Sequence, residues 1–320
     1  MIPVCEPNVS ITSKSLVGST IEDNVVGACG RTLAEFELEL ARYHGVDKAY
    51  AVLTGTLALE LAIEATKAIY EPKARVAHFE TLTFIATAAA CVRNRMKCNV
   101  HDVQAVHEHW SPDVRHVDVG YTRIADAAAA HGEDLSRFPV ATLSFNANKP
   151  ITTGQGGAIL CSDPSIAEYV ENRLGLCRAP HVGHYAHWDL GRNYRMPAIN
   201  AALGLAQLRE LDWTKKIRKD IHDAYVGAGM NMLPTTWQAI WLTPKHPDLV
   251  ICELKRQGID ARRFWLPMHM QPCRSMLGIK DGLHFERAEM IYDHAVMLPC
   301  STGIPKWDLR KVIDRCAEFV

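Results

Sequence analysis

Short apolar runs alternate with helix-like stretches between residues 32 and 211, and this alternation restricts the fold more than any other feature. Strands are expected at residues 49–53, 76–79, 98–100, 116–119, 123–126, 140–145 and 158–161. Amphipathic or alanine-rich helices are expected at residues 32–43, 57–70, 83–95, 164–174 and 197–211. Strands and helices that alternate in this way predict an α/β fold, in which helices flank a mostly parallel sheet.

The pattern changes after residue 211. Helices are expected at residues 214–228, 247–256 and 286–294 and from residue 306, and strands at 237–242, 260–264 and 296–298. These elements predict a smaller α+β domain, so the chain is divided into a large domain, residues 1–211, and a small one, residues 212–320. Residues 1–30 are expected to be irregular because prolines and glycines punctuate them.

Lys149 lies between an expected strand, residues 140–145, and a glycine-rich loop, in the stretch SFNANKPITTGQGG. Pro150 disfavours the helical region for Lys149, so the lysine is placed on a turn just past a strand's carboxyl end. Open α/β sheets bind their ligands at such ends. Two interpretations stay open on these residues alone: a solvated loop lysine, or an amine that forms a Schiff base with a carbonyl cofactor.

Two other strand ends carry polar groups. Thr54, Gly55 and Thr56 separate a strand from a helix, which suits either a simple N-cap or an anion site at the helix N-terminus. Asp126 ends the expected strand at 123–126 among small residues. It is either the N-cap of a following helix or a buried counter-charge.

Composition narrows the classes of function. The 320 residues are 48% hydrophobic and 22% charged, as in ordinary globular proteins, and the net charge of −1 argues against a nucleic-acid partner. Ten scattered cysteines without a CxxC pair indicate reduced thiols in a cytoplasmic protein, and no metal-binding spacing occurs. The chain start lacks the features of a signal peptide, and no stretch approaches the ~20 apolar residues of a membrane helix.

Segments from end to end resemble the DegT/DnrJ/StrS family of sugar aminotransferases, which use pyridoxal phosphate and have the aspartate aminotransferase fold. The segments are IPVCEPNVS, AVLTGTLALELAI, TLTFIATAAA, IADAAAAHG, SFNANKPITTGQGGAI, GRNYRMPAINAALGLAQL, GIDARRFWLPMHMQP and AVMLPC. The last two look most like perosamine-synthase-type members. The resemblance implies an aminotransferase that moves an amino group, from glutamate as the expected donor, to a 4-keto-6-deoxy sugar nucleotide.

The resemblance also implies residue roles. Lys149 would hold pyridoxal 5'-phosphate as a Schiff base and then move a proton between substrate and cofactor, while Asp126 would pair with the pyridine nitrogen. The phosphate and ring would be bound by Thr54, Gly55, Thr56, Phe84 and Ser144. Asn193 would reach the phosphate site of the second subunit in a homodimer. Substrate would be contacted by His187, Arg195 and His269.

The chain departs from the family pattern at Ala129, where relatives carry Gln or His, and in its shortness between residues 102 and 125, 130 and 140, and within 229–247. Three alternatives therefore stay beside the sugar aminotransferase: an aminotransferase acting on a non-sugar ketone, a sugar dehydratase, and a non-catalytic regulator. In the dehydratase relatives a histidine replaces the lysine, so Lys149 argues against that alternative.

Overall fold

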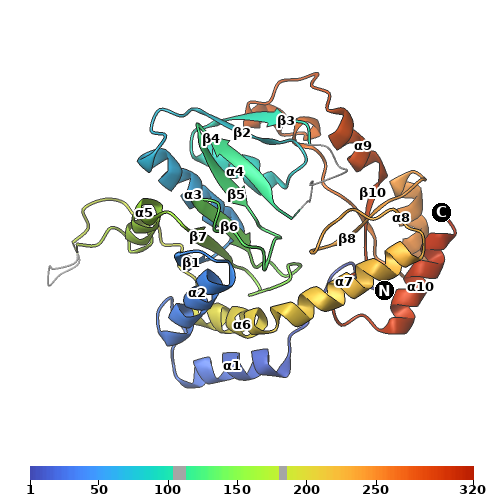
Figure 1. The fold of residues 1–320 in the computed structure, drawn as a ribbon, viewed down its shortest axis with the longest axis horizontal. Helices are drawn as coiled ribbons and strands as arrows, with labels where there is room; N and C mark the ends of the chain where they lie inside the picture. The colour runs from blue at the N-terminus through green and yellow to red at the C-terminus, as the bar shows by residue number, and fades with distance from the viewer. Residues whose placement is uncertain (104–112, 180–185) are drawn as a thin grey trace.

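The structure is a computed structural model that describes residues 1–103, 113–179 and 186–320. The larger of the two sheets in these residues has seven strands, in the order β1-β7-β6-β5-β4-β2-β3 (Figure 1). Its strands are β1 (Lys48–Val52), β2 (Val76–Glu80), β3 (Lys97–His101), β4 (Arg115–Val119), β5 (Thr122–Asp126), β6 (Val140–Ser144) and β7 (Gly157–Cys161).

Most strands of this sheet run in one direction. β2 pairs with β3 and β5 with β6 in parallel, whereas the other neighbouring pairs are antiparallel. As a result β1, β2, β3, β5 and β6 share one direction and only β4 and β7 are reversed, which confirms the mostly parallel sheet. β4 is reversed because a two-residue turn joins it to β5, and the first turn residue, Gly120, has a φ of +60° that favours glycine.

Helices cover both faces of the sheet. α3 (Gly55–Ile69), α4 (Ile85–Arg93) and α5 (Pro164–Leu174) pack on one face, and α2 (Arg31–Tyr43) and α6 (Ala198–Arg209) pack on the other. The apolar stripe of α2, formed by Leu33, Phe36 and Leu40, is fully enclosed beneath the sheet. The expected helix–sheet–helix layering therefore follows from the apolar patterning of the chain.

Residues 1–30 are not irregular throughout, so that prediction is wrong. Helix α1 (Ile11–Glu22) packs against α6, and Ser10 caps it by accepting a hydrogen bond from the Ser13 N–H at 3.1 Å. Its buried residues are Ser13 and Thr20 rather than large apolar side chains. Because the contact with α6 uses small polar residues, the apolar periodicity that reveals other helices is absent.

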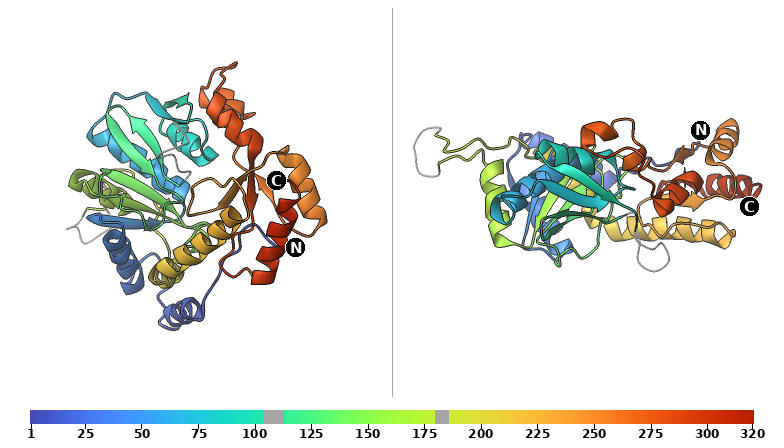
Figure 2. Two further views of the ribbon diagram at one scale, coloured as in Figure 1. Left: turned by 45° about the vertical axis from the view of Figure 1, so that its right-hand side comes forward. Right: turned by 90° about the horizontal axis from the view of Figure 1, so that it is seen from above.

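The residues after α6 form a second sheet, in the order β8-β10-β9. Figure 2 shows this part of the chain, coloured from yellow to red, beside the large sheet. The elements are α7 (Leu211–Gly227), β8 (Ala239–Leu242), α8 (Pro247–Arg256), β9 (Arg262–Arg263), the short helices η1 (Met268–Met270) and η2 (Arg274–Leu277), α9 (Glu286–His294), β10 (Ala295–Leu298) and α10 (Lys306–Ala317). Trp241 and Tyr225 are fully buried in their core, which Ile2 joins from the chain start through a bridge to Ile259. The division at residue 211 stays a prediction.

None of the helices in the described part of the chain is long and apolar enough to cross a membrane. All ten cysteines lie within that part and are free thiols.

Candidate active site

A cavity of about 280 Å³ lies where the carboxyl ends of β5 and β6 meet the N-terminus of α3. The residues that line it include seven of the expected site residues: Thr54, Gly55, Thr56, Phe84, Asp126, Ser144 and Lys149. Ala129 lines it as well. The volume is near the lower end of the range for small-molecule sites.

The first turn of α3 forms one wall. Thr54 caps the helix, because its hydroxyl accepts a hydrogen bond from the Leu57 N–H at 3.1 Å. The N–H groups of Gly55 and Thr56, the first two residues of α3, have no acceptor within the helix and lie at its positive dipole end. Gly55 also packs closely on β6, since a Cβ on it would meet the Ser144 Cβ at 2.7 Å. The N-cap is therefore confirmed, and the anion site at the same helix start stays a prediction.

Asp126 lies at the end of β5 and is 9% exposed. Its Oδ2 accepts a hydrogen bond from the Thr87 hydroxyl at 2.7 Å, and Thr87 in turn contacts the Thr83 hydroxyl at 3.0 Å. A turn, not a helix, follows Asp126, so the N-cap alternative for Asp126 is wrong. The residue is a buried carboxylate that faces the cavity.

Lys149 is held on a braced loop. His131 ties the loop on both sides of the lysine, since its ring nitrogens contact the Ser144 carbonyl at 2.9 Å and the Ile151 N–H at 3.2 Å. Burial lowers the pKa of the Lys149 amine to about 8, although the carboxylates of Asp126 and Asp113 act in the opposite direction. A solvated loop lysine would lack both the bracing and the lowered pKa.

Among the lining residues that were not predicted, four carry a charge or an indole ring: Asp113, Arg115, Trp237 and Trp265. Arg115 is the register partner of Asp126 across β4 and β5, so the two side chains share one face of the sheet. Trp237 covers the amine of Lys149, whose Nζ lies 3.7 Å from the ring centroid. No local motif marks these positions, and Asp113, Arg115 and Trp237 belong to the shortened segments. Part of the segment between residues 102 and 125 lies outside the described residues.

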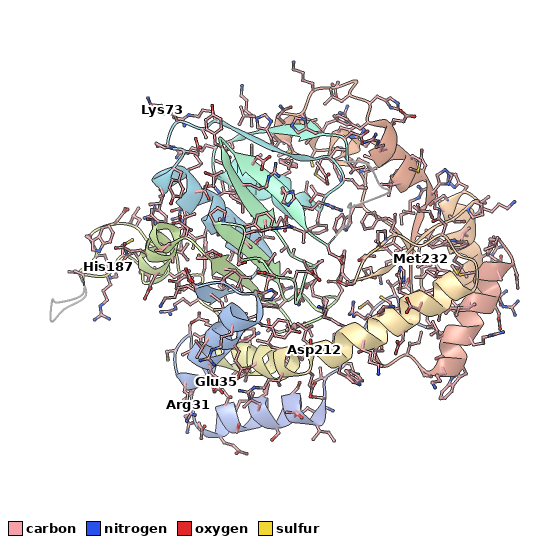
Figure 3. All side chains as sticks on the ribbon, viewed as in Figure 1. Arg31, Glu35, Lys73, His187, Asp212 and Met232 are labelled. Carbon is pink, nitrogen blue, oxygen red and sulfur yellow. The ribbon has the colours of Figure 1, made fainter. Side chains whose placement is uncertain are left out.

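Four predicted residues lie outside this cavity. His187 is exposed, forms an antiparallel bridge with Arg178, and lies beyond α5, away from the seven-stranded sheet (Figure 3). His269 is buried, and its ring contacts the Thr81 hydroxyl and the Glu289 carboxylate, each at 2.8 Å. Asn193 and Arg195 are exposed on the loop before α6.

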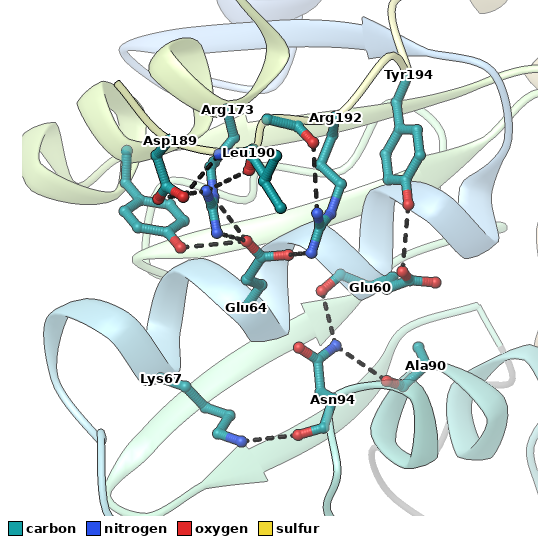
Figure 4. A network of polar contacts seen from close by, with 12 residues as sticks. Glu60, Glu64, Lys67, Ala90, Asn94, Arg173, Asp189, Leu190, Arg192 and Tyr194 are labelled. Carbon is teal, nitrogen blue, oxygen red and sulfur yellow. Dashed lines mark hydrogen bonds and ion pairs between the residues drawn. The ribbon is translucent and has the colours of Figure 1, made fainter. Parts of the chain in front are cut away.

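The loop that carries Asn193 is fixed by a network of ion pairs on α3 and α5 (Figure 4). Glu64 binds Arg173 and Arg192, each at 2.7 Å, and the Tyr194 hydroxyl donates to Glu60 at 3.3 Å. The Tyr194 carbonyl also accepts a hydrogen bond from the N–H of Leu53, next to the first turn of α3, at 2.8 Å. The loop therefore presents Asn193 at the surface from a defined position.

A partly buried amine, a buried carboxylate and a helix N-terminus around one cavity on an α/β sheet are the groups that bind and use pyridoxal phosphate. The amine would hold its aldehyde, the carboxylate its pyridine nitrogen and the helix its phosphate. The site and the fold thus define a pyridoxal-phosphate-dependent aminotransferase of the aspartate aminotransferase fold.

The chain belongs to the DegT/DnrJ/EryC1/StrS aminotransferase family, whose model matches residues 12–123 and 118–317. It is 27% identical to a GDP-perosamine synthase of Vibrio cholerae, over 95% of each chain. Its fold is similar to that of PseC, a Helicobacter pylori aminotransferase involved in pseudoaminic acid biosynthesis, with a TM-score of 0.86 and 16% identity over 99% of this chain and 98% of that one. The pyridoxal-phosphate form of the sugar aminotransferase Spr1654 from Streptococcus pneumoniae gives a TM-score of 0.84 and 18% identity, over 98% of this chain and 97% of that one. This family assignment overturns the non-catalytic alternative.

Proposed function

We propose that this aminotransferase moves an amino group from glutamate to a 4-keto-6-deoxy sugar nucleotide, as a step of amino-sugar biosynthesis. One observation carries the proposal: the amine of Lys149 opens on the same cavity as Asp126 and the first turn of α3. The similarity to a GDP-perosamine synthase over nearly the whole chain supports a sugar nucleotide as acceptor.

Three groups of the chain perform the chemistry. When bound, pyridoxal phosphate supplies an aldehyde and an electron-withdrawing ring. Lys149 would hold the aldehyde and would move a proton at its Nζ, for which its pKa of about 8 is well matched to neutral pH. Asp126 would pair with the ring nitrogen, because a neighbouring carboxylate favours the charged form of a base. The first turn of α3 would bind the phosphate and so orient the ring.

Borohydride reduction tests the cofactor site. The protein loaded with pyridoxal phosphate is expected to absorb in the visible, and reduction is expected to fix the cofactor on Lys149 alone, as measured by peptide mapping. A Lys149→Arg variant keeps the positive charge but cannot form the bond, so it serves as the control. An adduct on another lysine of the wild-type protein would exclude the assigned role.

The two substrates are tested separately by stopped-flow absorbance. Glutamate alone is expected to abolish the visible band and to release 2-oxoglutarate, and a 4-keto-6-deoxy sugar nucleotide is then expected to restore the band and to leave aminated. Restoration by non-sugar ketones only would replace the proposed acceptor class. Persistence of the band with every amino acid would refute the proposed half-reaction.

We further infer a homodimer with shared active sites, in which Asn193 completes the phosphate site of the partner subunit. Asn193 is exposed, and the contacts of its neighbours Arg192 and Tyr194 with α3 hold it in place, which supports this role. Mixing inactive Lys149→Ala and Asn193→Ala chains is expected to restore activity, because one site of each mixed dimer then carries neither defect. Proven subunit exchange without recovery would exclude a shared site.

A further inference from the structure

Trp237 contacts the Lys149 loop at two points. Its indole ring faces the Lys149 amine, with 3.7 Å between Nζ and the ring centroid. Its Nε1–H donates a hydrogen bond of 2.9 Å to the carbonyl of Asn148, the residue before the lysine. One side chain from another part of the chain therefore fixes both the backbone and the tip of Lys149.

Trp237 is itself rigidly placed. It is 3% exposed and packs on Trp265, with ring centroids 5.6 Å apart. The two residues before it, Thr235 and Thr236, are bound by the Asp113 carboxylate, which accepts hydrogen bonds of 2.6 Å from the Thr235 hydroxyl, 2.6 Å from the Thr236 N–H and 2.8 Å from the Thr236 hydroxyl. Asp113 lies two residues before β4 of the large sheet, so the position of the indole is set from both sheets.

We propose that Trp237 is a positioning residue for Lys149, whose indole face holds the ammonium group at the cavity through a cation–π contact until the cofactor binds. An indole is the strongest of the aromatic partners for a cation, and the contact is strengthened where water is excluded. The inference rests on the proposed function only in so far as the positioned amine is the one that binds the cofactor.

The indole acts among several charged or titratable groups that face the lysine from other elements. These are Asp126 at the end of β5, Asp113 before β4, Arg218 on α7, Cys5 in the N-terminal segment and His131 in the loop after β5. Carboxylates favour the ammonium form, whereas Arg218 and burial disfavour it. The indole ring favours the ammonium form, as the carboxylates do. Weakening the π-electron density of the ring without changing its shape is therefore expected to lower the pKa of Lys149.

The test replaces Trp237 by fluorinated tryptophans, which keep the shape and the Nε1–H but weaken the cation–π contact with each added fluorine. The pKa of Lys149 is measured in the cofactor-free full chain by competitive labelling with acetic anhydride across pH, followed by mass spectrometry of the Lys149 peptide. We expect a stepwise fall, by roughly 0.4 to 1.5 pH units for the trifluorinated ring. The same analogues at Trp265 serve as the matched control and are expected to leave the pKa unchanged.

A Lys149 pKa that does not respond to fluorination at position 237, or responds equally at position 265, would overturn the proposal. A Trp237→Phe variant separates the two contacts, because it keeps a π face and loses the donor to Asn148. The pKa of Lys149 is expected to fall less in this variant than in Trp237→Leu. Acetylation needs no cofactor, so these outcomes are independent of the borohydride test. A normal response to fluorine without a cofactor adduct on Lys149 would refute the proposed function and leave the role of Trp237 intact.

Discussion

Replacing Lys149 by methionine is expected to stabilise the cofactor-free chain near neutral pH. Burial lowers the pKa of this amine from 10.5 to about 8, so its ammonium form is less stable in the folded chain than in the unfolded one. At about 1.4 kcal/mol per pH unit, this difference corresponds to about 3 kcal/mol of lost stability. Methionine has a similar length, carries no charge and packs well on an aromatic ring such as Trp237.

The pH dependence has a defined sign. Below pH 8 the lysine is charged in both states and its full cost is present. Between pH 8 and 10.5 the folded chain has released the proton while the unfolded chain still holds it, so the cost of Lys149 fades as the pH rises. The advantage of methionine is therefore expected to be about 3 kcal/mol at pH 6.5 and close to zero at pH 10.5.

Urea unfolding of the cofactor-free proteins at pH 6.5, 9 and 10.5, at equal protein concentration, measures this difference. Lys216→Met, at an exposed position on α7, is the matched control and is expected to change the free energy of unfolding little at any pH. A Lys149→Met chain that gains no stability at pH 6.5, or whose gain stays constant up to pH 10.5, would refute the reasoning.

Three other substitutions test the walls of the cavity. Gly55→Ala places a Cβ 2.7 Å from the Ser144 Cβ, so it is expected to cost about 1–3 kcal/mol of stability and to weaken cofactor binding, as measured by urea unfolding and by titration of the visible band. Asp113→Asn removes a charged acceptor of three hydrogen bonds and is expected to lower the free energy of unfolding by about 1.5–3 kcal/mol in the same assay. An unchanged free energy of unfolding would show that other contacts hold the Thr235–Trp237 segment. Thr87→Val leaves the shape of α4 unchanged but removes the donor to buried Asp126, which is expected to lower the free energy of unfolding by about 1–3 kcal/mol. An unchanged unfolding midpoint would show that the 2.7 Å hydrogen bond contributes little to stability.

Local signals account for the elements that were predicted well. Helix α5 has the predicted bounds because Asp163 caps it and Pro164 occupies its first position, and α8 follows the same logic with His246 and Pro247. Strand direction is not a local property, because a run such as Arg115–Val119 has the same alternation whichever way it runs. The reversal of β4 therefore required the hairpin geometry at Gly120.

The candidate site divides in the same way. Lys149, Asp126 and the first turn of α3 were predictable because each ends or follows a strand, and strand ends on one side of a sheet converge. Trp237 and Asn148 are 89 positions apart, and their hydrogen bond depends on how the two sheets meet. The same holds for Asp113, whose partners Thr235 and Thr236 belong to the second sheet's connections.

Ala129 shows why the cavity walls matter for a shortened member of this family. A buried carboxylate needs donors or a counter-charge to stay ionised, and a methyl group at position 129 provides neither. Asp126 obtains a donor from Thr87 on α4, and the guanidinium of Arg115, its register partner, lines the same cavity. The Arg115 guanidinium also lies 3.7 Å from the Glu80 carboxylate, so its charge serves more than one carboxylate. The donor to Asp126 comes from α4 and the neighbouring guanidinium from β4, so neither depends on the turn that carries Ala129.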